Sequence, residues 1–346
     1  MTRRVRLGVI GIGMGAKPHV AALKDLQQSD RVEVAGVYSR DRTRRDAFAA
    51  AHGWRAAESP EAMAADRTLD AVLILTPPNA RADLVATFAR AGKAILMEKP
   101  VERTTTAAEA IVAEAARAKV PLGIVFQTRF RSAALALAER LRAGALGPIA
   151  QIRLDVPWWR PQSYYDEPGR GTYARDGGGV LISQAIHAMD MMLSVTAPVL
   201  DVVALAGTTR LHRMESEDFA AAGLRFADGA TGFLSATTAA YPGGPETLAI
   251  HGERGSAVLR GGALTIAWCD GREETIGGAA ATGGGADPMA FDHGPHRALI
   301  ADFLDAVVEA RAPAIDGRSA LRVHRLIDAI LESARIGARV AVAGES

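Results

Sequence analysis

The stretch VRLGVIGIGMGAKPHVAALKDL, residues 5–26, decides the fold of this chain. It opens with an apolar run typical of a strand, passes through a glycine-rich turn, and continues with helical spacing. In such a unit Gly11 permits the tight turn, Gly13 lets the backbone approach a pyrophosphate, and small Ala16 lets the helix pack closely on the strand. The helix N-terminus adds unpaired N–H groups and a partial positive charge. We therefore predict a dinucleotide-binding turn, against the alternative of a glycine turn in an unrelated α/β protein; its residues are Gly11, Ile12, Gly13, Met14, Gly15 and Ala16.

The length and composition favour a globular protein of two domains. The chain has 346 residues, which is more than one ordinary core accommodates. Forty basic residues against 39 acidic ones give a net charge of +1, so neither nucleic acid nor a membrane is an expected partner. The single cysteine, Cys269, excludes an intrachain disulfide and a cysteine zinc cluster. Residues 1–4 lead directly into the first strand with no signal-peptide core, so we expect a cytoplasmic protein.

The end of the second predicted strand, residues 32–37, indicates which dinucleotide binds. An acidic residue at this distance from the glycine turn holds the ribose hydroxyls of NAD, whereas here the chain reads Ser39-Arg40. A hydroxyl and a guanidinium suit a 2′-phosphate, so we predict NADP, with NAD as the alternative because Asp41 could also reach a ribose. We interpret Arg44 and Arg45 as the solvated face of the next helix.

Strands and helices alternate through residues 1–127, which predicts a Rossmann domain, a doubly wound parallel sheet. Two polar turns follow strands of this sheet, Thr76-Pro77-Pro78-Asn79 and Glu98-Lys99-Pro100. Ligands of open parallel sheets bind at the carboxyl ends of their strands. These turns are therefore candidate parts of the site.

Residues 128–346 predict an α+β domain with an open, mostly antiparallel sheet, and the last helix has the option of packing back on the first domain. One face of this sheet should cover a helix and the other should pair with a second subunit, giving a homodimer or homotetramer. We expect residues 277–285, rich in Gly and Ala, to form a mobile loop. The predicted strands are 199–206, 216–226, 231–238, 246–252 and 256–260, and the helices are 132–143, 181–193, 295–310 and 317–336.

Residues 157–165, which we call the aromatic loop, carry two Trp and two Tyr residues. Aromatic rings stack on the apolar faces of sugar rings, and Arg160 or Gln162 can bind hydroxyls. We predict that a substrate lies between this loop and Lys99, with Trp159 and Arg170 among its contacts. The alternative is a hydrophobic loop that closes the sheet edge or an oligomer interface.

Two motifs together resemble one known family. Glu98-Lys99-Pro100 ends a strand of the dinucleotide fold, and the later segment 176–190 contains Asp176-Gly177-Gly178-Gly179, His187 and Asp190. This set resembles the Gfo/Idh/MocA family of NAD(P)-dependent oxidoreductases over nearly the whole chain. The resemblance implies a Rossmann domain joined to an open-sheet domain, and oxidation or reduction of sugars, cyclitols and related polyols by dimers or tetramers.

The resemblance also implies roles for individual residues. Lys99 matches the catalytic lysine, preceding a cis Pro100, and His187 matches the histidine that exchanges a proton with the reacting hydroxyl. Trp159-Arg160 resembles a pair that touches NADP in some members. The implied cofactor contacts also include Thr76, Pro77, Asn79, Glu98 and Gln127.

Two positions depart from the family pattern. Ser183 stands where many members have an aspartate, and a serine can orient a substrate hydroxyl but cannot act as a base at neutral pH. Arg81 stands where members often have a histidine, which removes one expected cofactor contact. The first departure sustains an alternative function, a non-catalytic dinucleotide-binding regulatory protein that keeps the fold.

The histidines admit structural as well as functional interpretations. His187 could be a satisfied core histidine, and Asp190, three residues further on, could orient its imidazole or contact a neighbouring helix. We interpret His293 and His296 as surface or cleft-rim residues with no metal role, because no acidic or histidine cluster pairs with them in the sequence. We predict no metal site.

Overall fold

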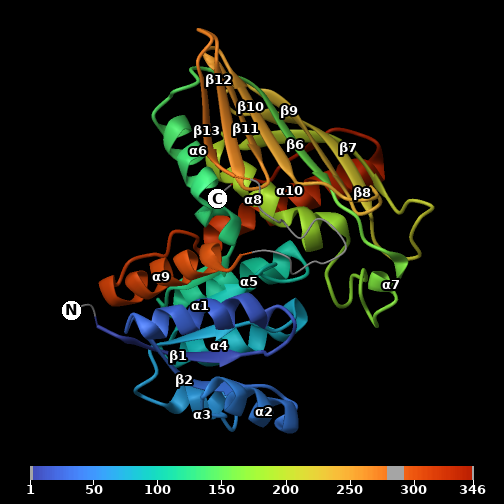
Figure 1. Ribbon diagram of the computed structural model, residues 1–346. Helices are drawn as coiled ribbons and strands as arrows, with labels where there is room; N and C mark the ends of the chain where they lie inside the picture. The colour runs from blue at the N-terminus through green and yellow to red at the C-terminus, as the bar shows by residue number, and fades with distance from the viewer. Residues whose placement is uncertain (1–2, 279–291, 345–346) are drawn as a thin grey trace. The chain divides into compact units, whose positions relative to one another are not determined.

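The computed structural model describes residues 3–278 and 292–344 (Figure 1). The chain divides into two compact units, each of which contains two stretches of sequence. Unit 1 comprises Met1–Gln127 and His293–Leu321, and unit 2 comprises Thr128–Asp292 and Arg322–Ser346. Residues 279–291, which include most of the expected mobile loop, lie outside the described residues.

Unit 1 is built on a parallel sheet of five strands in the order β2-β1-β3-β4-β5. All four pairings are parallel, and the residues of β3 are fully buried because helices cover both faces. Strand order reverses beside β1, which is the switch point where ligands of such sheets bind. The predicted doubly wound sheet is confirmed. Its strands are β1 Val5–Ile10, β2 Val32–Tyr38, β3 Ala71–Ile74, β4 Ala94–Glu98 and β5 Leu122–Val125.

The helices of unit 1 begin where the sequence offers capping side chains. Asp41, Ser59 and Thr104 each accept a backbone N–H from the first turn of the helix that follows. After unit 2 the chain returns to unit 1, where α9 packs against α1. These helices are α1 Ala16–Gln28, α2 Arg42–His52, α3 Pro60–Ala65, the 3₁₀ turn η1 Pro78–Ala80, α4 Ala82–Arg90, α5 Thr105–Arg117, α9 Gly294–Glu309 and the start of α10 Gly317–Ile336.

Unit 2 contains an open sheet of nine strands in the order β13-β12-β11-β10-β6-β9-β8-β7-β14. Its pairings are antiparallel except that between β6 and β9, which confirms the predicted mostly antiparallel sheet. Helices α6 and α8 pack on one face of it. The strands are β6 Ile149–Pro157, β7 Val199–Gly207, β8 Phe219–Phe226, β9 Thr231–Thr237, β10 Thr247–Gly252, β11 Gly255–Arg260, β12 Ala263–Trp268, β13 Glu273–Gly277 and β14 Val340–Ala341.

Three expectations for unit 2 need correction. The predicted strand 216–226 begins only at Phe219, because the three residues before it bind other segments through buried side chains. The predicted helix 181–193 starts as a π-helical turn, η3 Leu181–Ala185, and becomes α-helical in α8 Ile186–Val195. The strands β12, β13 and β14 were not predicted. The other helical elements of unit 2 are η2 Gln127–Phe130, which starts at the last residue of unit 1, α6 Ser132–Arg142, α7 Gln162–Tyr165 and most of α10.

Candidate active site

The glycine turn after β1 has the geometry of a dinucleotide cradle. Gly11 has φ +97°, and a Cβ there would lie 2.8 Å from the Leu75 carbonyl carbon, so glycine is required. A Cβ on Gly13 or Gly15 would meet no atom within 4 Å, which leaves the outer side of the turn open. The N–H of Ala16 donates to the Gly13 carbonyl and starts α1. The turn thus offers exposed backbone N–H groups at a helix N-terminus, which suits a pyrophosphate.

The end of β2 differs in one respect from the expectation. Arg40 is exposed and Ser39 half-exposed, as the predicted phosphate contacts require. Arg44 is exposed, as interpreted above, and its guanidinium also donates to the Ile12 carbonyl at 3.0 Å and so braces the glycine turn. The interpretation of Arg45 as solvated is wrong, because its side chain is only 12% exposed and pairs with Asp46. Asp41 uses its carboxylate to accept the Arg44 N–H as the N-cap of α2. Asp41 therefore has a structural role as the N-cap of α2, which accounts for an acidic residue at this position.

Two buried polar atoms at the carboxyl edge of the parallel sheet have no hydrogen-bond partner within the described residues. They are Thr76 Oγ1, just beyond β3, and Gln127 Oε1, just beyond β5. Buried polar atoms are normally satisfied, so an unsatisfied pair marks a place where a polar ligand belongs. Both residues were predicted to contact the dinucleotide, and these atoms fit one. Pro77 and Asn79, in the same turn as Thr76, are exposed.

Arg81 explains its departure from the family pattern. Its side chain is buried and donates to the carbonyls of Thr76, Glu98 and Pro100. It therefore ties the turn after β3 to the Glu98-Lys99-Pro100 turn after β4. Burial lowers the pKa of Arg81 to about 10, although Glu98 and Glu102 oppose this, so the guanidinium stays charged at neutral pH. Arg81 is a brace of the site.

The Glu98 carboxylate holds the position of the neighbouring lysine. Its Oε1 lies 2.7 Å from Nε2 of His19 on α1, and its Oε2 accepts the backbone N–H of Lys99 at 3.0 Å. Burial would raise the pKa of Glu98, but the hydrogen bond and charge of His19, with Lys99 and His296, lower it to about 2. The half-buried Lys99 thus follows an ionised carboxylate that links it to the dinucleotide helix. The Lys99–Pro100 bond is cis, as expected.

The interpretation of His296 as a surface or cleft-rim residue is wrong. This histidine is 2% exposed, because α9 packs on α1, and its ring meets that of His19 edge-on with centroids 4.9 Å apart. With Glu98 the two histidines form a group whose candidate ligand atoms lie within 4.8 Å of one another. The structure therefore contains a cluster of potential metal ligands that the sequence did not reveal. The His19–Glu98 separation of 2.7 Å is a hydrogen-bond distance, whereas two ligands of a tetrahedral zinc with bonds of about 2.0–2.1 Å lie about 3.3 Å apart. We interpret the group as an ion pair. His293 pairs with Asp25 at a half-exposed position.

In unit 2, Ser183 and His187 share the one accessible face of a buried helical segment. They are half-buried, whereas every other residue from 180 to 193 is buried. Of the two alternatives for Asp190, the structure shows the contact to a neighbouring helical element, because Arg129 on η2 donates to both of its oxygens. Burial raises the pKa of Asp190, against the opposing charge of Arg129. Asp190 thus fastens α8 to η2.

The aromatic loop is built around stacked rings and guanidinium groups. Tyr164 lies between two of them, with Arg170 4.6 Å and Arg160 5.6 Å from its ring centroid. Trp159 is half-buried, makes an isolated bridge to Ala239, and meets the Tyr241 ring edge-on. Arg160 is buried, and burial lowers its pKa. The loop therefore presents apolar ring surface together with positive charge.

The comparisons with known proteins agree with this geometry. Residues 5–126 match the model of an oxidoreductase family with a NAD-binding Rossmann fold, and residues 134–258 match the Gfo/Idh/MocA C-terminal domain. The rhizopine catabolism protein MocA of Rhizobium meliloti is 31% identical over 261 residues, covering 74% of this chain and 78% of that protein. Inositol 2-dehydrogenase of Rhizobium meliloti is 26% identical over 260 residues, covering 73% and 74%.

Among solved structures, the WlbA dehydrogenase of Bordetella pertussis, in complex with NADH and UDP-GlcNAcA, has a TM-score of 0.83 and 28% identity. The match covers 99% of this chain and all of that one, 100%. Fold and nucleotide turn together define an oxidoreductase with a NAD-binding Rossmann domain. The chain belongs to the Gfo/Idh/MocA family.

Proposed function

We propose that this protein transfers hydride between a nicotinamide cofactor and a secondary alcohol or ketone of a sugar, sugar derivative or cyclitol. The observation that carries the proposal is the braced Glu98-Lys99-Pro100 turn at the carboxyl end of β4, beside the dinucleotide cradle. Inositol, acted on by one relative, and UDP-GlcNAcA, bound to another, both carry secondary alcohols. Within the described residues, no helix combines the length and apolarity needed to cross a bilayer.

In this proposal Lys99 is the acid/base. A nicotinamide supplies hydride acceptance or donation when bound. Hydride leaves a carbinol carbon only as the O–H proton is withdrawn, so a group at the oxygen must take that proton, and an ammonium there stabilises developing negative charge. His187 relays the proton or anchors the substrate, and Ser183, on the same helix face, orients a hydroxyl. Trp159 and Arg170 contact the sugar.

We further propose that NADP is the preferred cofactor. Ser39 and Arg40 offer a hydroxyl and a guanidinium to a 2′-phosphate, and Asp41 is engaged as the cap of α2. The glycine turn, the turn after β3, Glu98, Gln127 and the Trp159-Arg160 pair complete the proposed cofactor contacts.

Replacing Lys99 by alanine tests the proposed function. We expect Lys99→Ala to lower kcat by about 10²–10⁴, the usual contribution of a positioned acid/base, while the Kd for the dinucleotide changes less than threefold. Activity is followed by nicotinamide absorbance across a panel of polyols and ketoses with both cofactors. Lys24→Ala, on the exposed face of α1, is the control. If the wild type turns over no member of the panel but binds dinucleotide, the regulatory alternative replaces the enzyme.

A further inference from the structure

The dipeptide Glu217-Asp218, just before β8, carries two acidic side chains into the interior of unit 2. Glu217 is 5% and Asp218 0% exposed. Acidic residues are rarely buried to this degree without several partners, because removing a carboxylate from water is costly. Glu217 binds the segment that leads to Ser183 and His187, whereas Asp218 is connected through His212 to the aromatic loop.

Asp218 binds the segment between β7 and β8. Its Oδ1 accepts the Thr209 N–H and its Oδ2 accepts the Thr209 hydroxyl, both at 2.6 Å. The same Oδ2 lies 2.7 Å from Nδ1 of His212, whose side chain is 1% exposed. The carboxylate therefore fixes the imidazole as well as the segment that carries it.

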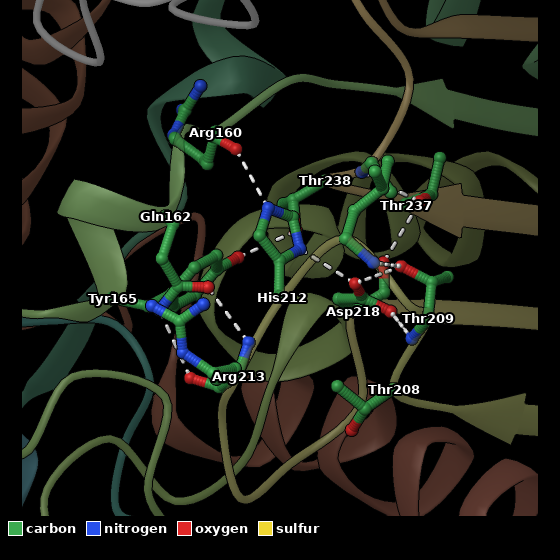
Figure 2. Close-up of polar contacts among 12 residues, drawn as sticks. Arg160, Gln162, Tyr165, Thr208, Thr209, His212, Arg213, Asp218, Thr237 and Thr238 are labelled. Atoms are coloured by element: carbon green, nitrogen blue, oxygen red, sulfur yellow. Dashed lines mark hydrogen bonds and ion pairs between the residues drawn. The ribbon is translucent and has the colours of Figure 1, made fainter.

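His212 connects Asp218 to the aromatic loop. Its Nε2 donates to the Arg160 carbonyl at 2.9 Å, and Figure 2 shows the ring between that carbonyl and Asp218. Because a carbonyl only accepts hydrogen bonds, Nε2 carries hydrogen, and Nδ1 and Asp218 Oδ2 share the second hydrogen bond. The His212 ring also meets the rings of Tyr165 at 4.9 Å and Trp159 at 6.1 Å.

Further bonds hold the loop to the same point. The N–H groups of Trp158 and Arg160 donate to the carbonyls of Thr237 and Thr238. Thr238 in turn donates its N–H to the Asp218 carbonyl, and its hydroxyl lies 2.6 Å from that of Tyr165 (Figure 2). Backbone and side chain of Asp218 thus converge on the aromatic loop.

Glu217 binds the start of the segment that carries Ser183 and His187. Its Oε2 accepts the Gly179 N–H and its Oε1 the Leu181 N–H, each at 3.1 Å, and its carbonyl accepts the Val180 N–H at 2.8 Å. A Cβ on Gly179 would lie 1.7 Å from that carbonyl oxygen, so the close approach requires glycine. Burial raises the pKa of Glu217, while these N–H groups oppose the shift.

We infer that Glu217 and Asp218, the latter through His212, are positioning residues that set the aromatic loop against the helix bearing Ser183 and His187, and so determine which polyol fits. The inference rests on the proposed function for its substrate. Two consecutive residues just before β8 hold the two elements, so the separation of those elements is limited to the span of one dipeptide and its side chains. A substrate contact on the loop and a proton relay on the helix then have a fixed spacing.

Hydrogen exchange tests each anchor separately, and each variant is the control of the other. In Asp218→Asn and His212→Gln we expect the amides of Trp158 and Arg160 to exchange at least about tenfold faster, with those of Gly179 and Leu181 unchanged. In Glu217→Gln we expect the reverse. Exchange of β6 amides should not change in any variant. Unchanged loop and helix amides, or a uniform acceleration throughout unit 2, would overturn the inference.

Kinetics provide the second measurement. Asp218→Asn should raise KM for the polyol at least about fivefold with kcat within twofold, and Glu217→Gln should lower kcat more than it raises KM. Asp270→Asn, an exposed carboxylate between β12 and β13, should change neither. If Asp218→Asn does not fold, His212→Gln removes the link between Asp218 and the Arg160 carbonyl, and an unchanged Arg160 amide in that variant refutes the anchor. Absence of polyol turnover in the wild type refutes the proposed function, whereas exchange still decides the anchors.

Discussion

Two arginine side chains in this protein hold backbone segments of the dinucleotide-binding unit in place. Arg81 donates to carbonyls from two separate turns, and Arg44 donates to the carbonyl of Ile12 in the dinucleotide turn. A planar guanidinium with five donors suits this role, because it reaches several acceptors in fixed directions. In the sequence, an arginine is usually interpreted as a surface charge. The hydrogen bonds of Arg44 and Arg81 depend on which turns come together.

At the residue scale, Arg40 should control the choice of dinucleotide. Arg40→Asp replaces a phosphate-binding guanidinium by a carboxylate that repels the 2′-phosphate and can accept bonds from ribose hydroxyls. We expect the ratio of kcat/KM for NADPH over NADH to fall at least about tenfold. Steady-state kinetics with both cofactors measure the ratio, and Arg42→Asp, exposed on α2, is the matched control. A wild type that already prefers NADH refutes the NADP proposal.

The His19–Glu98 pair should govern stability in acid. The folded pKa of Glu98 is about 2, below its ordinary 4.5, so the pair stabilises the fold fully above pH 4.5 and loses this contribution as the pH falls towards 2. His19→Gln removes the imidazole that binds the Glu98 carboxylate. We expect it to lower the free energy of unfolding at pH 7 by about 1–3 kcal/mol and to flatten the dependence between pH 5 and 2.

Urea unfolding at several pH values, followed by circular dichroism, measures both effects. His293→Gln breaks the half-exposed pair with Asp25 and is the control, since exposed pairs contribute about 0–1 kcal/mol. An equal slope in wild type and His19→Gln would show that His19 does not depress the pKa of Glu98.

At the element scale, the glycines before η3 let the start of a helix pack against the segment that precedes β8. Gly177 has φ +86°, and Gly179 lies against the backbone of Glu217. The π-helical turn that follows leads into the face with Ser183 and His187, and π-helical turns occur often at functional sites. The sequence predicted a helix here and the importance of the glycines. It did not predict the π turn, whose start binds Glu217 in the segment before β8.

Gly179→Ala tests this close approach. The new Cβ would overlap the Glu217 carbonyl oxygen at 1.7 Å, and backbone cannot move aside as a flexible side chain can. We expect a loss of unfolding free energy above about 3 kcal/mol, or no soluble protein. Gly207→Ala, where a Cβ meets no atom within 4 Å, should stay within about 1 kcal/mol of wild type. Similar urea midpoints for the two variants would contradict the packing described.

At the scale of the whole molecule, the outer face of the nine-stranded sheet carries an apolar patch on β7 and β9. Val203 and Leu205 on β7 are 50% and 71% exposed, and Phe233 on β9 is 39% exposed. Gly223 and Ala221 on β8 lie between these strands in register, so the surface among the large side chains is flat. We propose that a second copy of the chain packs on this face, as the sequence led us to expect.

Leu205→Glu tests that packing. A charge at the centre of the apolar face should be buried without a partner on association, so we expect the oligomer to dissociate at micromolar concentration while the fold persists. Light scattering after size exclusion gives the mass, and Leu211→Glu, an exposed leucine outside the strands, is the control. A monomeric wild type, or a Leu205→Glu oligomer of unchanged mass, would refute this interface.

The sequence by itself determined the features that are local in the chain. The glycine turn, the Glu98-Lys99-Pro100 turn and the alternation of strands and helices are each contained in a short run, where backbone preference and side-chain period act directly. These features sufficed for the fold class and for the family.

Only the tertiary structure decided which distant side chains meet. Glu98 binds His19, which is 79 residues away in the sequence, and Arg129 binds Asp190, which is 61 residues away. His212 connects Asp218 to Arg160 in the aromatic loop, 52 residues before the histidine. A buried charge is stabilised by whichever partners the packing brings, and packing is set by contacts summed over whole elements. A histidine or an acid therefore looks the same in the sequence whether it lies in solvent or, like His296, in the core.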